Sequence, residues 1–415
     1  MRNRQKLTVF AAALAGLGLC ACNSTYQCDQ PLPRHQPRAG NPMIHQDGQG
    51  LVGPDGEPIK LIAPNAGGWL HFESWMWGEG IRPFSMHQHA ERHVVARLEE
   101  LYGQSVAQQL ITHIYERFLV EADFETIAVM GFNAVRLPLN HEMLEGEDGF
   151  TYLDRAVDWG EAHGVHVIVD MHAAPGGQSS SFPADPDDTL LWDDADARAR
   201  LVALWGQIAA RYVGRTGVGA YDLLNEPDAP DGAQLVSMYE EILSAIRAVD
   251  PDHLVMIEGD DLAMDFTVFD RRLDENMVYQ AHQYIWFDLN PQDNIDGLAA
   301  LAACHDVPIW LGEFGENHAP DTAELRQAYD AAGFAGWGFW PWKKVPTGNY
   351  PGLVEIEAPE DFLKLAKDVT DATGSPGQLS EAQARAAVTG FLDAAQPGRM
   401  RCVGEVAAAL GVRCE

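Results

Sequence analysis

The chain has 415 residues, 46% of them hydrophobic, and carries a formal net charge of -33 at neutral pH. Phosphate recognition needs clustered Lys and Arg, so this charge argues against nucleic acid as a partner. The length and apolar content are sufficient for one large hydrophobic core, and α/β barrels of this size are often a single domain.

Residues 1–22 have the pattern of an export signal. A basic "MRNRQK" precedes the apolar "LTVFAAALAGLGL", which is too short to cross a bilayer, and "LCAC" follows. This order resembles a bacterial lipobox with Cys22 as the lipidated first residue, and the alternative is ordinary signal cleavage near Ala21. Residues 23–45 are Pro-rich and polar and are expected to be a tether. The sequence thus predicts an exported, periplasmic or cell-surface protein that contacts a membrane only through a lipid anchor.

Export would also permit disulfides among the six cysteines. Cys402 and Cys414 flank a short apolar helix-like stretch and are the best candidate pair. A bridge between Cys28 and Cys304 stays open, because spacing cannot decide it. No pair of cysteines and no Cys/His set has zinc spacing.

The body of the chain alternates strand-like and helix-like segments. "GLVGPDGEPIKLI" predicts a hairpin that closes one end of a barrel. Eight nearly continuous apolar runs then predict parallel strands covered on their outer face: 59–66, 133–139, 165–171, 220–225, 254–259, 277–283, 307–314 and 336–342. Helical patterns separate most of them, although "DLAMDFTVFDRR" is a poor helix, and "APEDFLKLAKDV" is expected to be the last barrel helix. The predicted fold is a (β/α)8 TIM barrel over residues 46–370, followed by a helical extension over 371–415.

Polar side chains stand at the ends of these predicted strands, which meet on one face of a barrel. They are Arg136, His172, Asn225, Glu226, His282, Tyr284, Glu313 and Trp340. Each alone is more often an ion pair or packing residue, but their convergence predicts a site. Two carboxylates with different protonation states are what glycoside hydrolysis requires, and retention of configuration places them about 5 to 5.5 Å apart. We therefore predict a retaining O-glycosyl hydrolase whose substrate is an oligo- or polysaccharide.

These motifs together resemble a family-5 glycoside hydrolase of the cellulase clan over roughly residues 59–370. The matching stretches are "GFNAVRLP", "VDMHAAPGGQ", "NEP", "AHQY", "GEFG" and "GWGFWPWKK". The resemblance implies Glu226 as acid/base and Glu313 as nucleophile, with Asn225 on the sugar 2-hydroxyl. It also implies that Arg136 and Tyr284 hold the nucleophile, that His172 and His282 line the site, and that Trp340, exposed in the cleft, stacks on the sugar.

The segment "NAGGWLHFESWMWG" is similar to the start of the exo-β-glucanase branch of that family, which implies that Glu73 binds a sugar hydroxyl. The chain departs from that branch at His71-Phe72 and at Ser74, so the linkage stays open. Alternatives are a catalytically weak carbohydrate-binding lipoprotein and a family-5 enzyme for mannan, xylan or a glycoconjugate. A metal site at His87, His89 and His93 is disfavoured, and no metal or organic cofactor is implied.

Overall fold

The computed structural model describes residues 32–33, 40–78, 86–146, 149–285, 291–347, 351–371 and 373–414. The predicted signal segment, most of the tether, Cys22 and Cys28 lie outside this part of the chain. Within it, no helix is both long enough and apolar enough to cross a membrane.

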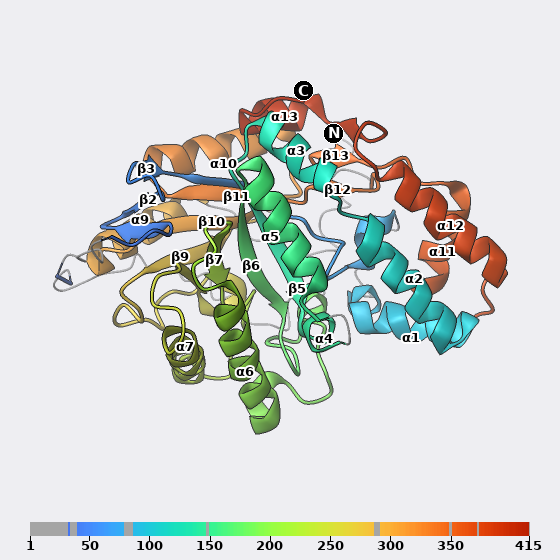
Figure 1. The fold of residues 1–415 in the computed structure, drawn as a ribbon, viewed down its shortest axis with the longest axis horizontal. Helices are drawn as coiled ribbons and strands as arrows, with labels where there is room; N and C mark the ends of the chain where they lie inside the picture. The colour runs from blue at the N-terminus through green and yellow to red at the C-terminus, as the bar shows by residue number, and fades with distance from the viewer. Residues whose placement is uncertain are drawn as a thin grey trace, which may run out of the picture.

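Eight parallel strands form one sheet that closes on itself (Figure 1). They are β4 (Leu61–Pro64), β5 (Ala134–Asn140), β6 (His166–Ala173), β7 (Val218–Asp222), β8 (Val255–Glu258), β9 (Met277–His282), β10 (Ile309–Gly315) and β11 (Gly336–Trp340). β11 pairs with β4, and the backbone N–H of Ala66 donates to the carbonyl of Arg136 at 2.8 Å, which joins β4 to β5. The predicted barrel is therefore confirmed, and each strand overlaps a run expected from its apolar residues.

Helices cover the outer face of the barrel because their apolar stripes recur at helical spacing. They are α3 (Glu121–Met130), α5 (Thr151–His163), α6 (Ala195–Tyr212), α7 (Gly232–Arg247), α9 (Pro291–His305) and α10 (Ala319–Ala332). The poor helix expected after the fifth strand is only α8 (Asp260–Ala263), in which Asp261 and Leu262 have positive φ. A short α4 (His141–Glu145) follows β5.

The N-terminal hairpin closes one end of the barrel. β1 (His45–Asp47), β2 (Gly50–Val52) and β3 (Pro58–Ile59) form a three-stranded antiparallel sheet. Ile44 and Leu51 are buried with barrel-interior side chains such as Met256 and Trp310, so this end of the barrel is filled by apolar packing. Chemistry is left to the opposite end, where the strands finish.

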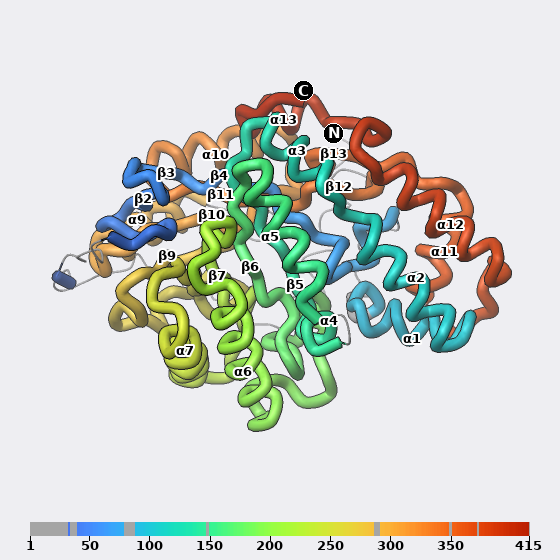
Figure 2. Tube along the Cα trace, viewed as in Figure 1, coloured from blue at the N-terminus to red at the C-terminus, as the bar shows by residue number. Residues whose placement is uncertain are grey.

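Four helices form a lobe beside the barrel, and they come from segments far apart in the sequence (Figure 2). They are α1 (Glu91–Tyr102), α2 (Gln104–Arg117), α11 (Glu360–Val369) and α12 (Glu381–Ala394). α11 packs on α1 and α12, which differs from its expected place as the last barrel helix.

The short helix α13 (Gly404–Leu410) lies on the barrel exterior instead. It packs on α10, and the N–H of Arg413 donates to the carbonyl of Met130 at the end of α3, at 3.1 Å. The expected disulfide between Cys402 and Cys414 is present and closes the loop that contains α13. A small sheet precedes α13 and consists of β12 (Lys343–Lys344), β13 (Val354–Glu355) and β14 (Arg401–Cys402).

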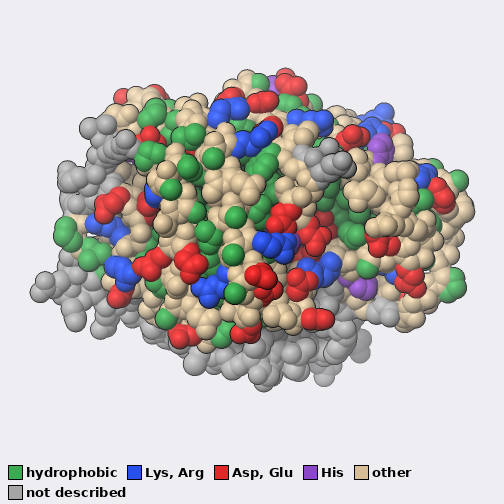
Figure 3. Space-filling view, turned by 60° about the horizontal axis from the view of Figure 1, so that its bottom comes forward, with side chains coloured by type: hydrophobic (Ala, Val, Ile, Leu, Met, Phe, Trp, Pro, Cys, Tyr) green, Lys and Arg blue, Asp and Glu red, His purple; other side chains and the backbone are tan. Residues whose placement is uncertain are grey.

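Both positively and negatively charged side chains cover the outer helices. On the face shown in Figure 3, Lys and Arg side chains are interspersed with Asp and Glu. Ion pairs also link the outer elements: Arg215, in the loop after α6, pairs with Asp158 and with Glu161 of α5, at 2.8 Å each. The described residues on this face therefore form no basic patch of the kind that phosphate binding needs.

Candidate active site

Glu226 lies just beyond the end of β7 in a left-handed backbone conformation, with φ of 44°. Such a conformation costs a non-glycine residue of order 1 to 3 kcal/mol and needs support from its surroundings. Support comes from Glu258 at the end of β8, whose Oε2 accepts a 2.7 Å hydrogen bond from the Glu226 backbone N–H. The carboxyl group of Glu226 is thereby fixed at the mouth of the barrel.

Glu313, on β10, is held by two donors, one on β5 and one just after β9. The guanidinium Nη1 of Arg136 donates to its Oε1 at 2.5 Å, and the Tyr284 hydroxyl donates to its Oε2 at 2.7 Å. Donation from a cation and a phenol favours the carboxylate form and fixes its orientation. Glu313 therefore has the surroundings of an anionic nucleophile.

The surroundings of Glu226 favour the protonated form. Burial raises the pKa of its carboxyl to about 7, although the positive charge of Arg136 opposes this shift. Its Oε1 lies 2.9 Å from Nδ1 of His282, whose own pKa is lowered to about 4 by burial. His282 is thus a neutral imidazole, and in the tautomer that satisfies both contacts its Nδ1–H donates to Glu226. Its Nε2 accepts from the Gln280 side chain at 3.1 Å.

A glycine makes room for this contact. A Cβ at Gly312 would lie 1.8 Å from the Gln280 side-chain nitrogen, so any larger residue would displace Gln280 from beneath His282. The glycine of "LGEF" therefore leaves room for the Gln280 side chain by its small size.

The two glutamates are close together. A carboxylate oxygen of Glu226, one of Glu313 and a ring nitrogen of His282 all lie within 4.8 Å of one another. Inverting glycosidases separate their carboxyl groups by roughly 6.5 to 9.5 Å to admit a water, whereas retaining enzymes need about 5 to 5.5 Å. The observed separation of the two glutamates fits the shorter distance, at which the carboxylate itself can attack.

Arg136 is the centre of a buried carboxylate cluster. Besides Glu313 it contacts Asp170, Asp222 and Glu258 at 3.1, 2.7 and 3.2 Å, and all four side chains of this inner group are fully buried. Burial raises the pKa of each of the three carboxyls, although the charge of Arg136 opposes the shift. These carboxyls share protons because one guanidinium cannot balance them all.

Asn225 and His172 are oriented by the same cluster. The Asn225 side-chain oxygen accepts from Arg136 at 2.8 Å, while its buried Nδ2 has no hydrogen-bond partner in the described part of the chain. Nδ1 of His172 lies 2.7 Å from Asp170, so the opposite ring nitrogen is left for a ligand. Burial, with the nearby charge of His71, lowers the pKa of His172 well below its usual value.

Trp340 lies in the site but is buried rather than exposed. Its ring stacks on that of His172, with centroids 5.5 Å apart and planes 3° from parallel, and only 3% of the residue is accessible. The expectation of an exposed platform was therefore wrong. A Cβ at Gly67 would come within 2.7 Å of the indole, so the loop after β4 packs closely over the ring.

Glu73 completes the wall at the start of η2 (Ser74–Trp77). Its Oε2 accepts from the Trp75 indole N–H at 2.8 Å, and burial raises the pKa of its carboxyl to about 8. Lys344 lies over the Trp75 ring, with its Nζ 4.6 Å from the ring centroid. The sequence-predicted residues are thus brought together at one end of the barrel.

The match to a family model decides the family. Residues 100–344 match the model for cellulase, glycosyl hydrolase family 5. The chain belongs to glycosyl hydrolase family 5. The eight-stranded barrel and the polar strand ends described above agree with that assignment.

Relatives of this family-5 hydrolase differ in the activity for which they are named. A β-xylosidase of Phanerodontia chrysosporium is 26% identical over 77% of this chain and 74% of its own length. A probable glucan 1,3-β-glucosidase A of Aspergillus fumigatus is 31% identical over 60% of this chain, which spans 64% of that protein. The solved rutinosidase of Aspergillus niger superposes with a TM-score of 0.57 at 17% identity, over 71% of this chain and 92% of its own, and shares the fold.

Sequence reasoning missed several charged residues of this family-5 hydrolase. Asp170 and Asp222 were read as parts of apolar strands, yet they are register partners on β6 and β7 and face Arg136 together. Single charges inside otherwise apolar strands were the available signal. Glu316 and Lys344 gave no such signal because they follow the barrel strands β10 and β11. Burial raises the pKa of Glu316 to about 7 and lowers that of Lys344 to about 8.

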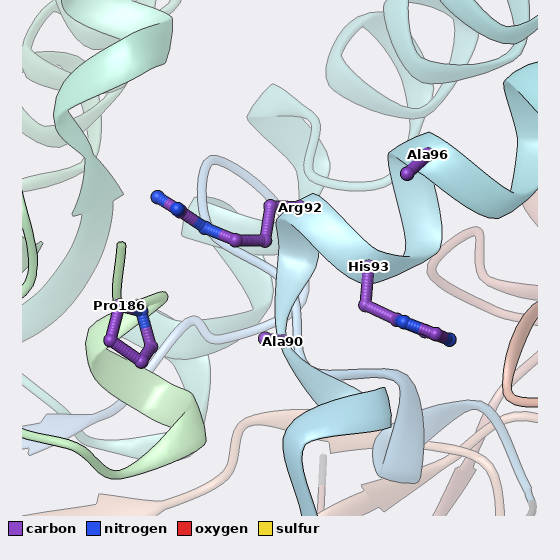
Figure 4. Close-up of a pocket in the computed structure, with 5 residues that line it drawn as sticks. All are labelled: Ala90, Arg92, His93, Ala96 and Pro186. Atoms are coloured by element: carbon purple, nitrogen blue, oxygen red, sulfur yellow. The ribbon is translucent and has the colours of Figure 1, made fainter. Parts of the chain in front are cut away.

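A separate pocket of about 410 Å³ lies between α1 and the loop after η4 (Phe182–Ala184), apart from the two glutamates (Figure 4). Its lining residues are Ala90, Arg92, His93, Ala96 and Pro186. Arg92 extends toward Pro186, whereas His93 extends to the other side of α1. His89, at the end of η3 (Met86–His89), instead pairs with Ser74 at 2.9 Å. The side chain of His87 lies outside the described residues.

Proposed function

We propose that this family-5 hydrolase cleaves a β-glycosidic bond by double displacement, with Glu313 as nucleophile and Glu226 as acid/base. The observation that carries the proposal is the contrast between two adjacent carboxyls. Glu313 accepts from Arg136 and Tyr284, whereas burial holds the pKa of Glu226 near 7. One is prepared to attack and the other to donate a proton.

In the first step a Glu313 oxygen forms a bond to the anomeric carbon while the bond to the leaving oxygen breaks. Glu226 gives its proton to that oxygen, so the aglycone leaves as a neutral alcohol. In the second step the Glu226 carboxylate takes a proton from water, and the resulting hydroxide equivalent displaces Glu313. The sugar is released with its configuration retained.

Several other side chains can hold the sugar. The free Nδ2 of Asn225 supports donation to the 2-hydroxyl, and Nε2 of His172 and the carboxyl of Glu73 support contacts with other hydroxyls. Trp340 is buried against His172, so its part in sugar binding would be to hold the His172 ring in place. These roles are proposed from position and chemistry.

We further propose that the substrate is a β-linked glucan, glucoside or related glycan. Support comes from the relatives, which are named for glucan 1,3-β-glucosidase and β-xylosidase activity. The test is a panel of β-1,3-, β-1,4- and β-1,6-glucans, mannan, xylan and aryl glycosides. Product sizes over time separate terminal release from internal cutting.

The role assignment is tested with two variants on an activated aryl glycoside. Glu313→Ala is expected to abolish turnover, because no glycosyl-enzyme bond can form. Glu226→Ala should give a burst of phenolate followed by slow turnover, because a low-pKa leaving group needs no proton whereas the second step needs a base. Azide, which needs no base, should speed that second step. A burst from Glu313→Ala, with Glu226→Ala inert, would reverse the assignment.

A further inference from the structure

Three buried side chains of types that can ligate a metal converge beside the proposed catalytic pair. His71 and Glu73 come from the loop after β4, and His172 comes from the end of β6. Their exposed fractions are only 1%, 3% and 2%. One ligand atom from each lies within 4.8 Å of the other two, and the His172 Nε2 to Glu73 Oε1 distance is 3.8 Å.

Each of the three is oriented by a neighbour on its other side. Asp170 lies 2.7 Å from Nδ1 of His172, Glu91 Oε2 lies 3.2 Å from Nδ1 of His71, and the Trp75 N–H donates to Glu73 Oε2. A carboxylate behind each imidazole is the usual support for a histidine that binds a metal through its other nitrogen. Neither ring nitrogen of His71 makes a hydrogen bond with a described residue, so its contact with Glu91 is an ion-pair distance only.

This set of two imidazoles and one carboxylate suits zinc. Zinc takes nitrogen and oxygen ligands at about 2.0 to 2.1 Å in tetrahedral geometry, which separates the ligand atoms by about 3.4 Å. The 3.8 Å distance between His172 and Glu73 exceeds that value by a few tenths of an ångström. Calcium and magnesium prefer more ligands, all of them oxygen, and fit less well.

We propose that His71, Glu73 and His172 bind a divalent transition metal, Zn²⁺ above all, through three protein ligands with the fourth position open to the cleft. The metal would use lone pairs of Glu73 and His172 that we assign to sugar hydroxyls. Metal and sugar should therefore exclude each other, and the ion acts as an inhibitor of glycosidase activity.

A second group of ligand atoms, from Glu226, His282 and Glu313, is equally compact but less suited to a cation. Both Glu313 oxygens already accept hydrogen bonds, from Arg136 and Tyr284. The guanidinium would also repel a metal ion at that point. Among the described residues, no arginine pairs directly with His71, Glu73 or His172, and carboxyls lie on two sides of this group, at Glu73 and Glu91.

The test is calorimetric titration of the metal-free mature chain with Zn²⁺, with no sugar present, so that the result does not depend on the proposed catalytic roles. We expect one tight Zn²⁺ per chain, with affinity reduced at least tenfold in His71→Gln. His282→Gln, which probes the competing group, and His318→Gln, an exposed histidine, should bind as the unmodified chain does. Unchanged affinity in His71→Gln, or loss in His282→Gln instead, would overturn the proposal.

Two measurements need no variant. Co²⁺ bound to three protein ligands should give the intense visible bands of a four-coordinate site, and weak octahedral bands would contradict the assigned geometry. Zn²⁺ should also inhibit aryl-glycoside hydrolysis competitively, with an inhibition constant equal to the calorimetric Kd. Tight binding without inhibition would show that the ion lies outside the sugar path.

Discussion

Arg136 is surrounded by more negative charge than it can neutralise. Four carboxyls, of Asp170, Asp222, Glu258 and Glu313, contact this one guanidinium in a buried region. If all four were ionised, the group would carry a net charge of about -3, which is prohibitive without water. Protons retained on the inner carboxyls solve this problem and leave the charge of Arg136 available to Glu313.

This proton sharing predicts how stability depends on pH. Burial raises the folded-state pKa of Asp222 above the unfolded value of about 3.9. Its contribution is fully present below pH 4 and is lost as pH rises through the folded value. Asp222→Asn mimics the protonated acid and keeps an oxygen for Arg136, so the variant should lose less stability than the unmodified chain between pH 4 and pH 8. Chemical denaturation at a series of pH values measures this difference.

Asp154 on α5 is the matched control for that measurement. Burial raises its pKa, but hydrogen bonds from Arg211 and Tyr212 outweigh burial and lower it. Asp154→Asn should therefore show the opposite sign, with the stability lost by the variant greatest at neutral pH and smallest at low pH. The same pH trend in both variants would contradict the account of the Arg136 cluster.

Glu226 predicts the alkaline limb of the activity profile. With its pKa raised to about 7 by burial, the acid loses its proton as pH rises through that value. For a sugar leaving group, kcat/KM should fall about tenfold per unit above pH 7. For a dinitrophenyl glycoside, which needs no protonation in the first step, the fall should be absent or much weaker. Parallel profiles for the two substrates would remove Glu226 from the acid role.

At the scale of elements, strands and helices differ in how far sequence determines them. Each barrel strand is a buried apolar run that could belong only to a sheet covered on its outer face, and all eight were predicted. The place of α11 was not, because its helical period fits the lobe of α1 and α12 as well as the barrel. α13 has only seven residues, and nothing in its sequence specifies α10 as its neighbour.

The residues of the site also differ in how far the sequence predicts them. Residues near the carboxyl ends of strands, such as Asn225 and Glu313, could be predicted because barrel topology brings strand ends together. Arg136, expected near a strand end, is instead the third of the seven residues of β5 and lies deeper in the barrel. Glu316 and Lys344 lie beyond the barrel strands, where the conformation of the connecting segments decides their contacts. His71 and His172 lie about a hundred positions apart in the sequence, so their proximity could not be predicted from spacing. Close spacing singles out only His87, His89 and His93.

α13 and its disulfide give a prediction at this scale. Replacing Cys402 and Cys414 together by Ser reopens a loop of 12 residues, which should lower the free energy of unfolding by about 2 to 4 kcal/mol. α13 contacts α10 and the end of α3 on the barrel exterior, so kcat/KM should change less than twofold. Denaturant unfolding and steady-state kinetics measure the two quantities. A large loss of activity with unchanged stability would show that α13 acts on the site.

At the scale of the whole molecule, the charge of -33 bears on how the protein meets a membrane. Anionic lipid surfaces attract polybasic segments and repel an acidic body. Ion pairing with lipid headgroups is therefore a poor means of attachment for this chain. An apolar anchor, such as the acyl chains predicted at Cys22, does not depend on the charge of the folded body.

The last prediction follows from that contrast. We propose that the exported chain is lipid-anchored at Cys22, so the unmodified protein should sediment with membranes, remain there in high salt and be released by detergent. High salt would release a protein held by ion pairs, because the Debye length falls to about 3 Å at 1 M. Cys22→Ala should yield soluble protein, whereas Cys20→Ala, two positions earlier, should leave the protein on the membrane. Cleavage near Ala21 without lipidation instead predicts soluble protein from the unmodified chain.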